Sequence, residues 1–143
     1  MGVCGTMNKE TAKMTLPAEL ENLELMIKFI RNGVGKLGFD GKEMNRIQLA
    51  SEEVLMNVIS HAYPDSSGDV EITYHIRDDK SLVIEVVDWG ISFDPLSVPE
   101  PDIEASVEDR VIGGLGIYMM RNIMDEARYE RVGDRNTLTL VKH

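Results

Sequence analysis

Three polar residues at helical spacing, Glu53, Asn57 and His61, are the first candidates for chemistry in this chain. They lie four residues apart, so on an α-helix they stack along one face, each one turn above the last. A helix has no packing reason to align a carboxylate, a carboxamide and an imidazole, whereas a helix that holds a metal-bound phosphate chain does. Considered alone, the three residues are explained equally well as a solvated helix surface.

A second candidate is the motif Asp88-Trp89-Gly90, which follows a run of apolar residues typical of a buried strand. A carboxylate at a strand end can accept a hydrogen bond from an exocyclic amine, and a glycine leaves room for a flat ring to approach the backbone. An ordinary strand-end turn uses the same residue types, and for this motif alone it is the better explanation.

The third candidate is the glycine-rich segment Gly113-Gly114-Leu115-Gly116, which precedes residues with helical apolar spacing. Such an entry leaves several amide hydrogens pointing outward, with the positive end of the helix dipole behind them, and this arrangement binds phosphate. A flexible loop explains the glycines as well. The segment lacks the lysine of a P-loop and does not follow a strand, so neither the P-loop nor the dinucleotide fingerprint fits.

The elements that must position these motifs can be predicted from hydrophobic periodicity and turn residues. We expect a disordered segment at 1–8 and a single domain at 9–143. The elements expected within the domain are a strand at 11–16, helices at 17–33 and 42–62, strands at 70–76 and 82–87, a long loop at 94–112, a helix from 113–116 to about 126, and strands at 128–132 and 137–141. This order predicts an α+β fold, a two-layer sandwich whose mostly antiparallel sheet is covered by helices on one face.

The composition narrows the functional classes. The 143 residues include 43% apolar and 28% charged residues, which is ordinary for a globular domain. The formal charge of -10 argues against a nucleic-acid partner, because phosphate backbones require clustered Lys and Arg. The single cysteine, Cys4, cannot form an internal disulfide, so we expect the reducing cytoplasm. No apolar run reaches the roughly 18 residues of a membrane span, so we expect no membrane partner.

Taken together and in order, the motifs resemble the Bergerat nucleotide-binding fold of the GHKL superfamily. That superfamily includes gyrase, chaperones of the ninety-kilodalton class, histidine kinases and mismatch-repair ATPases. Within it, the chain is most similar to the bacterial anti-sigma factor serine kinases. The resemblance covers roughly residues 10–142, and it rests on the segments 51–63, Phe93-Asp94-Pro95 and 114–126.

The resemblance implies roles for individual residues toward ATP and Mg²⁺. Asn57 would bind Mg²⁺ together with the phosphates, and Glu53 would be the general base for the attacking hydroxyl. Asp88 would receive the adenine amino group, Gly90 would let the ring approach, and Thr137 would support the adenine through a hydrogen bond.

The resemblance also implies a phosphate-binding segment and a lid. Gly113, Gly114, Leu115 and Gly116 would lie against the phosphates, beneath a lid formed by residues 94–112. Arg110 is the nearest candidate for the basic residue that the family often places before its glycine block. His61 would be structural and pack near Tyr63, because Mg²⁺ bound to a triphosphate prefers oxygen ligands.

The function implied is that of an ATP-dependent serine protein kinase. It would phosphorylate a small anti-anti-sigma factor with a STAS domain, sequester a sigma factor, and form a homodimer through the first strand and first helix. The alternative is a non-catalytic module that sequesters a sigma factor or related regulator. The presence of Glu53 favours the enzyme, because nucleotide binding requires Asn57 and Asp88 but no base.

Overall fold

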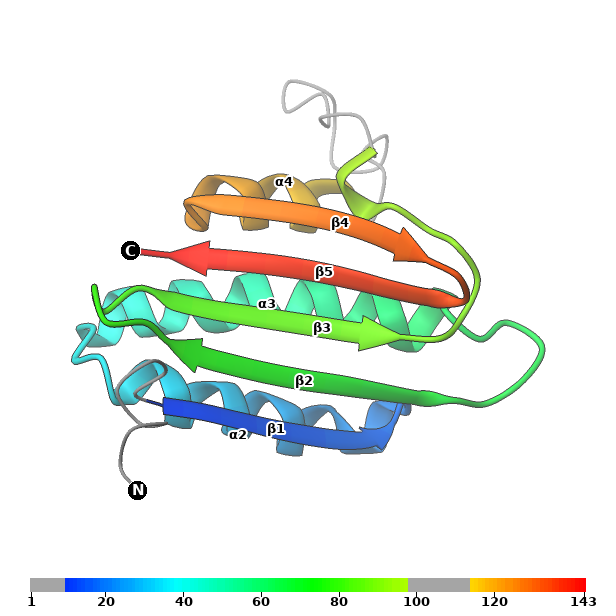
Figure 1. Ribbon diagram of the computed structural model, residues 1–143, viewed down its shortest axis with the longest axis horizontal. Coiled ribbons are helices and arrows are strands. Elements are labelled where there is room, and N and C mark those ends of the chain that lie inside the picture. The colour runs from blue at the N-terminus through cyan, green and yellow to red at the C-terminus, as the bar shows by residue number, and fades with distance from the viewer. Residues whose placement is uncertain (1–9, 98–113) are drawn as a thin grey trace.

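A single antiparallel sheet forms one layer of the molecule, and helices cover one of its faces (Figure 1). The computed structural model describes residues 10–97 and 114–143. Within these residues, five strands pair in the order β1-β2-β3-β5-β4, each antiparallel to its neighbour. The strands are β1 (Glu10–Pro17), β2 (Asp69–Ile76), β3 (Leu82–Asp88), β4 (Glu126–Val132) and β5 (Arg135–Lys142). The predicted α+β sandwich is confirmed.

The second layer consists of helices α2 (Leu23–Gly35), α3 (Gly41–His61) and α4 (Gly114–Ile123). Short 3-10 turns, η1 (Leu20–Asn22) and η2 (Pro95–Ser97), precede α2 and follow β3. The central helix α3 packs against both α2 and α4. Asp40 caps α3, because its carboxylate accepts a hydrogen bond from the Glu43 amide at 2.7 Å.

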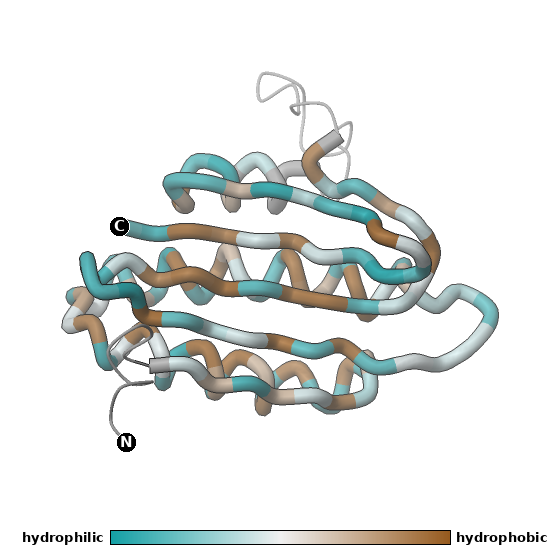
Figure 2. Tube along the Cα trace, in the orientation of Figure 1, coloured by the Kyte–Doolittle hydropathy of each residue, from teal (hydrophilic) through white to brown (hydrophobic). Residues whose placement is uncertain are grey.

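The core lies between the two layers, where the apolar faces of the helices meet the inward side chains of the sheet. Figure 2 shows hydrophobic residues recurring along the helices and the strands of both layers. Alternate residues of β3 and β5 point toward the helices, as the pleat of a strand requires. The largest of the fully buried side chains are Met26, Ile30, Ile47, Leu55, Ile72, Leu82, Ile84, Met120 and Leu140. The alternation also places Asp88, at the end of β3, on the helix-facing side of the sheet.

The structure corrects three predicted boundaries. Pro17 does not begin a helix: it is the last residue of β1 and pairs with Asp69, and α2 begins at Leu23. The ladder continues past the proline, since the Ala18 amide donates to the Gly68 carbonyl at 2.9 Å. The helix α4 ends at Ile123, because the Asp125 amide donates to the Val141 carbonyl and starts the pairing of β4 with β5.

The third correction concerns the last hairpin, where a two-residue turn replaces the longer turn expected between residues 132 and 137. Arg135 pairs with Val132, so only Gly133 and Asp134 lie between the strands. Gly133 has a φ of 61°, the conformation that the first central residue of a type II′ hairpin requires. The tighter turn lengthens β5 and brings Asn136 into the ladder, opposite Asp88.

Several expectations fall outside the described residues. The disordered start at 1–8 and most of the lid at 94–112 lie there, so both stay predictions. In the described part of the chain, no helix is long and apolar enough to cross a membrane.

Gly33 allows close packing of α2 on the sheet, which leads to a first prediction. A Cβ atom at Gly33 would lie 2.9 Å from ring carbons of Tyr74, a buried residue whose ring is also packed on Phe29. We expect Gly33→Ala to lower the free energy of unfolding by about 1–2 kcal/mol, because overpacking outweighs the gain in helix propensity. Gly35→Ala is the matched control, since its Cβ meets only Met44 at 3.8 Å. Urea unfolding checks the pair, and equal stability of the two variants would contradict the packing role.

Candidate functional site

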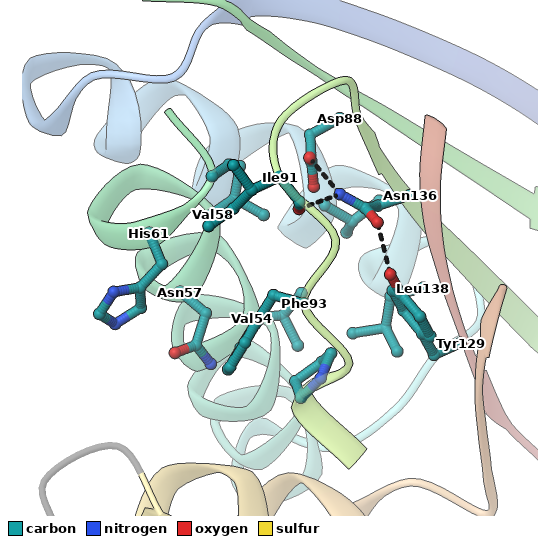
Figure 3. Close-up of a pocket in the computed structure, with 13 residues that line it drawn as sticks. Val54, Asn57, Val58, His61, Asp88, Ile91, Phe93, Tyr129, Asn136 and Leu138 are labelled. Carbon is teal, nitrogen blue, oxygen red and sulfur yellow. Dashed lines mark hydrogen bonds between the residues drawn. The ribbon is translucent and has the colours of Figure 1, made fainter. Parts of the chain in front are cut away.

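A pocket lies where the C-terminal half of α3 meets the end of β3 and the start of β5 (Figure 3). Its walls combine apolar side chains with a few polar groups, as small-molecule sites usually do. The residues that line it are Val54, Asn57, Val58, His61, Ala62, Val86, Asp88, Ile91, Phe93, Pro95, Tyr129, Asn136 and Leu138. The structure therefore brings Asn57 and Asp88, predicted from separate motifs, to one cavity.

Asn57 presents an unused hydrogen-bonding group in this pocket. Its amide nitrogen Nδ2 is buried and has no hydrogen-bond partner among the described residues. Such a buried donor costs about 1–3 kcal/mol unless something satisfies it. The side-chain amide therefore offers donors to a phosphate and a carbonyl oxygen to a metal ion.

Glu53 lies one turn before Asn57 on α3 and is half-buried. Burial raises the pKa of its carboxyl group above the usual 4.5, and the neighbouring charge of Glu52 raises the pKa further. Glu53 does not line the pocket itself. Glu53 is on the turn of α3 that precedes Asn57, where a group acting on a ligand bound at Asn57 would be placed.

His61, the third residue of the helical series, does line the pocket. Its ring packs on Phe93, with the centroids 5.9 Å apart and the planes tilted by 45°. The structural role predicted for His61 stays a prediction, and the contact that the structure shows is the one with Phe93. This contact places the Phe93-Asp94-Pro95 motif across the end of α3.

Asp88 lies at the bottom of the pocket and is 6% exposed. Its oxygen Oδ1 accepts hydrogen bonds from the Gly90 amide at 2.9 Å and from Asn136 Nδ2 at 2.8 Å. Within the described part of the chain, the second oxygen, Oδ2, makes no hydrogen bond. The carboxylate can therefore accept a hydrogen bond from a ligand amine.

Gly90 is required for the close contact between the turn after β3 and the end of α3. A Cβ atom at this position would lie 2.1 Å from the Ala62 carbonyl oxygen, which no side chain could tolerate. The same carbonyl accepts a hydrogen bond from the Ile91 amide at 2.9 Å. The glycine thus lets the turn close onto the helix, and the room that it was expected to leave for a ring stays a prediction.

Tyr63 connects three segments beside this contact, a role that the motif analysis missed. Its hydroxyl donates to the Asp69 carbonyl at 2.7 Å and accepts from the Trp89 amide at 2.9 Å. Its ring fills the space that a Cβ of Gly68 would need, at 2.2 Å. Tyr63 therefore holds the end of α3, the start of β2 and the turn after Asp88 in one arrangement. Its position directly after the helical series was the available indication.

Thr137 is not among the residues that line the pocket, and its predicted contact with adenine stays a prediction. Thr137 pairs with Val87, on the sheet face opposite the helices, whereas Asn136 pairs with Asp88 on the pocket side. The physical reason is the two-residue period of a strand, which turns neighbouring side chains to opposite faces. Asn136 and Leu138 are the β5 residues that reach the pocket.

The glycine-rich segment is described only in part. Gly114, Leu115 and Gly116 form the first turn of α4, whereas Gly113 and Arg110 lie outside the described residues. Figure 3 shows the start of α4 on the side of the pocket where Asn57 lies. The free amides of a helix N-terminus favour an anion, so this end of the pocket suits phosphate.

These residues fit a nucleotide bound together with a metal ion. The Asp88 carboxylate, which can accept a hydrogen bond from an amine, lies at one end of the pocket. The unsatisfied side-chain amide of Asn57 and the N-terminus of α4 lie at the other end. The described residues hold no group of three His, Cys, Asp or Glu that could bind a metal alone. Magnesium would therefore need oxygens of the ligand itself, which is how it usually binds with phosphates.

Comparison with known proteins agrees with this geometry. Residues 16–142 match the histidine kinase-like ATPase domain family. Because the match covers most of the chain, the protein belongs to this family, whose members use ATP. The predicted GHKL membership is confirmed.

The curated relatives specify the kind of enzyme. The chain is 31% identical over 121 residues to the serine-protein kinase RsbW of Halalkalibacterium halodurans, covering 82% of this chain and 74% of that protein. It is 29% identical over 121 residues to the serine-protein kinase RsbW of Bacillus cereus, covering 82% of this chain and 75% of that protein. The prediction of a serine-protein kinase is thus confirmed.

Solved structures support the fold. The RsbU and RsbW domains of Rv1364c from Mycobacterium tuberculosis superimpose with a TM-score of 0.67 and 19% identity, covering 94% of this chain but only 32% of that chain. The blue-light activated histidine kinase EL346 of Erythrobacter litoralis gives a TM-score of 0.54 and 20% identity, covering 86% of this chain and 40% of that chain. The present chain therefore spans less than half of either structure, and these likenesses show the fold alone.

The two bonds of the Tyr63 hydroxyl generate a second prediction. Tyr63→Phe removes both bonds and leaves the ring in place, so we expect a loss of about 1–3 kcal/mol in the free energy of unfolding. We also expect nucleotide affinity to fall, because the turn after Asp88 is released. The control is Tyr74→Phe, whose hydroxyl makes one long contact of 3.4 Å with Lys36 far from the pocket. Chemical unfolding and calorimetry with ATP measure both effects; a variant with wild-type stability and affinity would refute the role of Tyr63.

The raised pKa of Glu53 generates a third prediction, on pH. Above this pKa the charged carboxylate is less favourable in the folded protein than in the unfolded chain; below 4.5 it is protonated in both. We therefore expect Glu53→Gln to raise the thermal midpoint at pH 8, and the gain to disappear as the pH falls through the raised pKa to below 4.5. Thermal scans between pH 4 and 8 measure this, with Glu24→Gln on the exposed surface as control. A gain that is independent of pH would contradict the prediction.

Proposed function

We propose that this protein phosphorylates a serine of a small anti-anti-sigma factor with a STAS domain, and that it also sequesters a sigma factor in the cytoplasm. The observation that carries the proposal is the buried, unsatisfied amide of Asn57, with Glu53 one turn away and Asp88 across the same pocket. A site that only bound a nucleotide would need no carboxylate at the position of Glu53.

In this proposal, Asp88, Asn57 and the start of α4 bind and orient the nucleotide. Bound ATP with Mg²⁺ supplies the transferable phosphoryl group. Asp88 Oδ2 accepts a hydrogen bond from the exocyclic amine of adenine, Asn57 binds the metal and phosphates through its amide, and the first amides of α4 face the phosphates. Val54, Val58 and Leu138 give the pocket apolar walls that exclude water from the adenine ring.

Glu53 is the general base for the acceptor. Its carboxylate takes the proton of the incoming serine hydroxyl as the oxygen attacks the terminal phosphorus of ATP; a serine O–P bond forms, the bond from that phosphorus to ADP breaks, and ADP leaves. The raised pKa of Glu53 makes the carboxylate a stronger base than a fully solvated one. Phosphoryl transfer needs mainly positioning and charge stabilisation, so a single base beside a well-held nucleotide is sufficient protein chemistry.

The partners are proposed from the family. The relatives are named serine-protein kinases, which supports a protein serine as acceptor. A homodimer through β1 and the first helix is also proposed. Met26 and Ile30 of that helix belong to the core of the same chain. The exposed Leu20 and Leu25 beside the edge strand β1 remain available for such an interface.

Paired substitutions in α3 provide the fourth prediction. We expect Glu53→Ala to lower the rate of phosphoryl transfer by about 10²–10⁴-fold with nearly unchanged ATP affinity, because the base acts only on the acceptor. We expect Asn57→Ala to reduce both, because Asn57 contacts the metal and phosphates. Calorimetry with Mg-ATP measures affinity, and radiolabelled ATP with a bacterial lysate reveals the phosphorylated small protein.

The competing function is a non-catalytic ATP-binding module that sequesters a regulator. If the wild type phosphorylates no protein, or if Glu53→Ala keeps full activity toward a cognate serine, this second function replaces the first. Loss of ATP binding in wild type would instead overturn the nucleotide site itself.

A further inference from the structure

Asn136 is the most completely bonded polar side chain of the pocket. It is 5% exposed, and all of its hydrogen-bonding capacity is used. Its Nδ2 group donates to Asp88 Oδ1 and to the Ile91 carbonyl, both at 2.8 Å. Its Oδ1 accepts from the Tyr129 hydroxyl at 2.5 Å and from Arg131 at 3.1 Å. The two acceptors beside Nδ2 and the two donors beside Oδ1 fix the orientation of the Asn136 side-chain amide.

The partners of Asn136 are themselves held by neighbouring elements. Tyr129 and Arg131 come from β4, the strand next to β5, and Arg131 also donates to the Gly90 carbonyl at 2.7 Å. The Ile91 amide is bonded to the end of α3. The amide of Asn136 therefore joins β3, β4, β5 and the turn after Asp88 (Figure 3).

We propose that Asn136 is a positioning residue for Asp88 and thereby determines the preference of the pocket for 6-amino over 6-oxo purine nucleotides. The inference rests on the proposed nucleotide function and adds a residue that the motifs did not indicate. Asn136 and the Gly90 amide both bond Asp88 Oδ1, which prevents rotation of the carboxylate and leaves Oδ2 to face a ligand.

The chemical consequence is selectivity at position 6 of the purine ring. A carboxylate oxygen held in place accepts a hydrogen bond from the amine of adenine. It repels the carbonyl oxygen that hypoxanthine and guanine carry there, since both groups are acceptors. A mismatch of this kind leaves buried polar groups unpaired, which discriminates more strongly than a change of shape.

The test measures the ratio of ATP to ITP affinity, because these nucleotides differ only in that amine and carbonyl and in the proton that accompanies the carbonyl on N1. Asn136→Asp keeps the size of the side chain but replaces the donor toward Asp88 with a second carboxyl group. Two carboxyl groups so close share a proton, and a protonated Asp88 would donate to the carbonyl of ITP instead of accepting from ATP. We expect the ratio of ATP to ITP affinity to fall at least about tenfold.

Two further variants complete the experiment. Thr139→Val is the matched control on the same strand; its side chain is on the opposite face and outside the pocket, so the ratio should not change. Tyr129→Phe removes one donor to Asn136 without altering the charge, and we expect the ratio to fall about threefold. A general loss of packing would weaken both nucleotides equally and leave the ratio constant.

The possible results distinguish a failure of the role of Asn136 from a failure of the nucleotide site itself. If wild type binds ATP in preference to ITP and folded Asn136→Asp keeps that ratio, the positioning role is wrong while the nucleotide site stands. If Asn136→Asp does not fold by circular dichroism, Tyr129→Phe decides in its place, and an unchanged ratio overturns the role. If wild type does not distinguish the two nucleotides, the proposed contact of Asp88 with adenine fails as well.

Discussion

The site depends on one backbone contact, the closure of the turn after β3 onto the last turn of α3. The Ala62 carbonyl accepts the Ile91 amide, and the absence of a Cβ at Gly90 permits the approach. Tyr63 secures the same junction from its other side through the Trp89 amide. Because helix and sheet meet here with little freedom, Asn57 on α3 and Asp88 on β3 are held at a constant separation across the pocket. A binding site assembled from two layers needs such a connection, since packing of the core alone leaves the ends of the elements free to move.

The polar groups of the pocket reduce stability where the ligand is to bind. The Asn57 amide is buried without a partner among the described residues, and the raised pKa of Glu53 means that its charge is unfavourable in the fold. Asp88, more deeply buried than Glu53, is instead compensated by the Gly90 amide and Asn136. The difference agrees with the tasks that we propose for them. A recognition group must be immobile and can be satisfied on one side, whereas groups that act on phosphate or acceptor must remain available until the ligand arrives.

Much of the fold was predictable because its information is local. Helical spacing located α3, and alternation located β2 and β3. The errors arose where distant pairing overrides local preference. Pro17 resembles the first residue of a helix, but it ends an edge strand because Asp69 and Gly68 provide partners for that segment. Likewise, the type II′ turn at Gly133 follows from the register of β4 with β5, which no window of sequence specifies.

The sequence by itself determined the chemistry of the site: a carboxylate, a carboxamide and a strand-end aspartate whose types and order indicate a nucleotide-binding kinase. Only the tertiary structure decided which neighbours complete it. Thr137 and Asn136 are adjacent in the chain, and a strand sends them to opposite faces, so the pairing with β3 selects Asn136 for the pocket. Tyr63 and Tyr129 act through contacts with residues 26 and 7 positions away. Such contacts depend on register and layer packing, which are properties of the whole fold and not of any single segment.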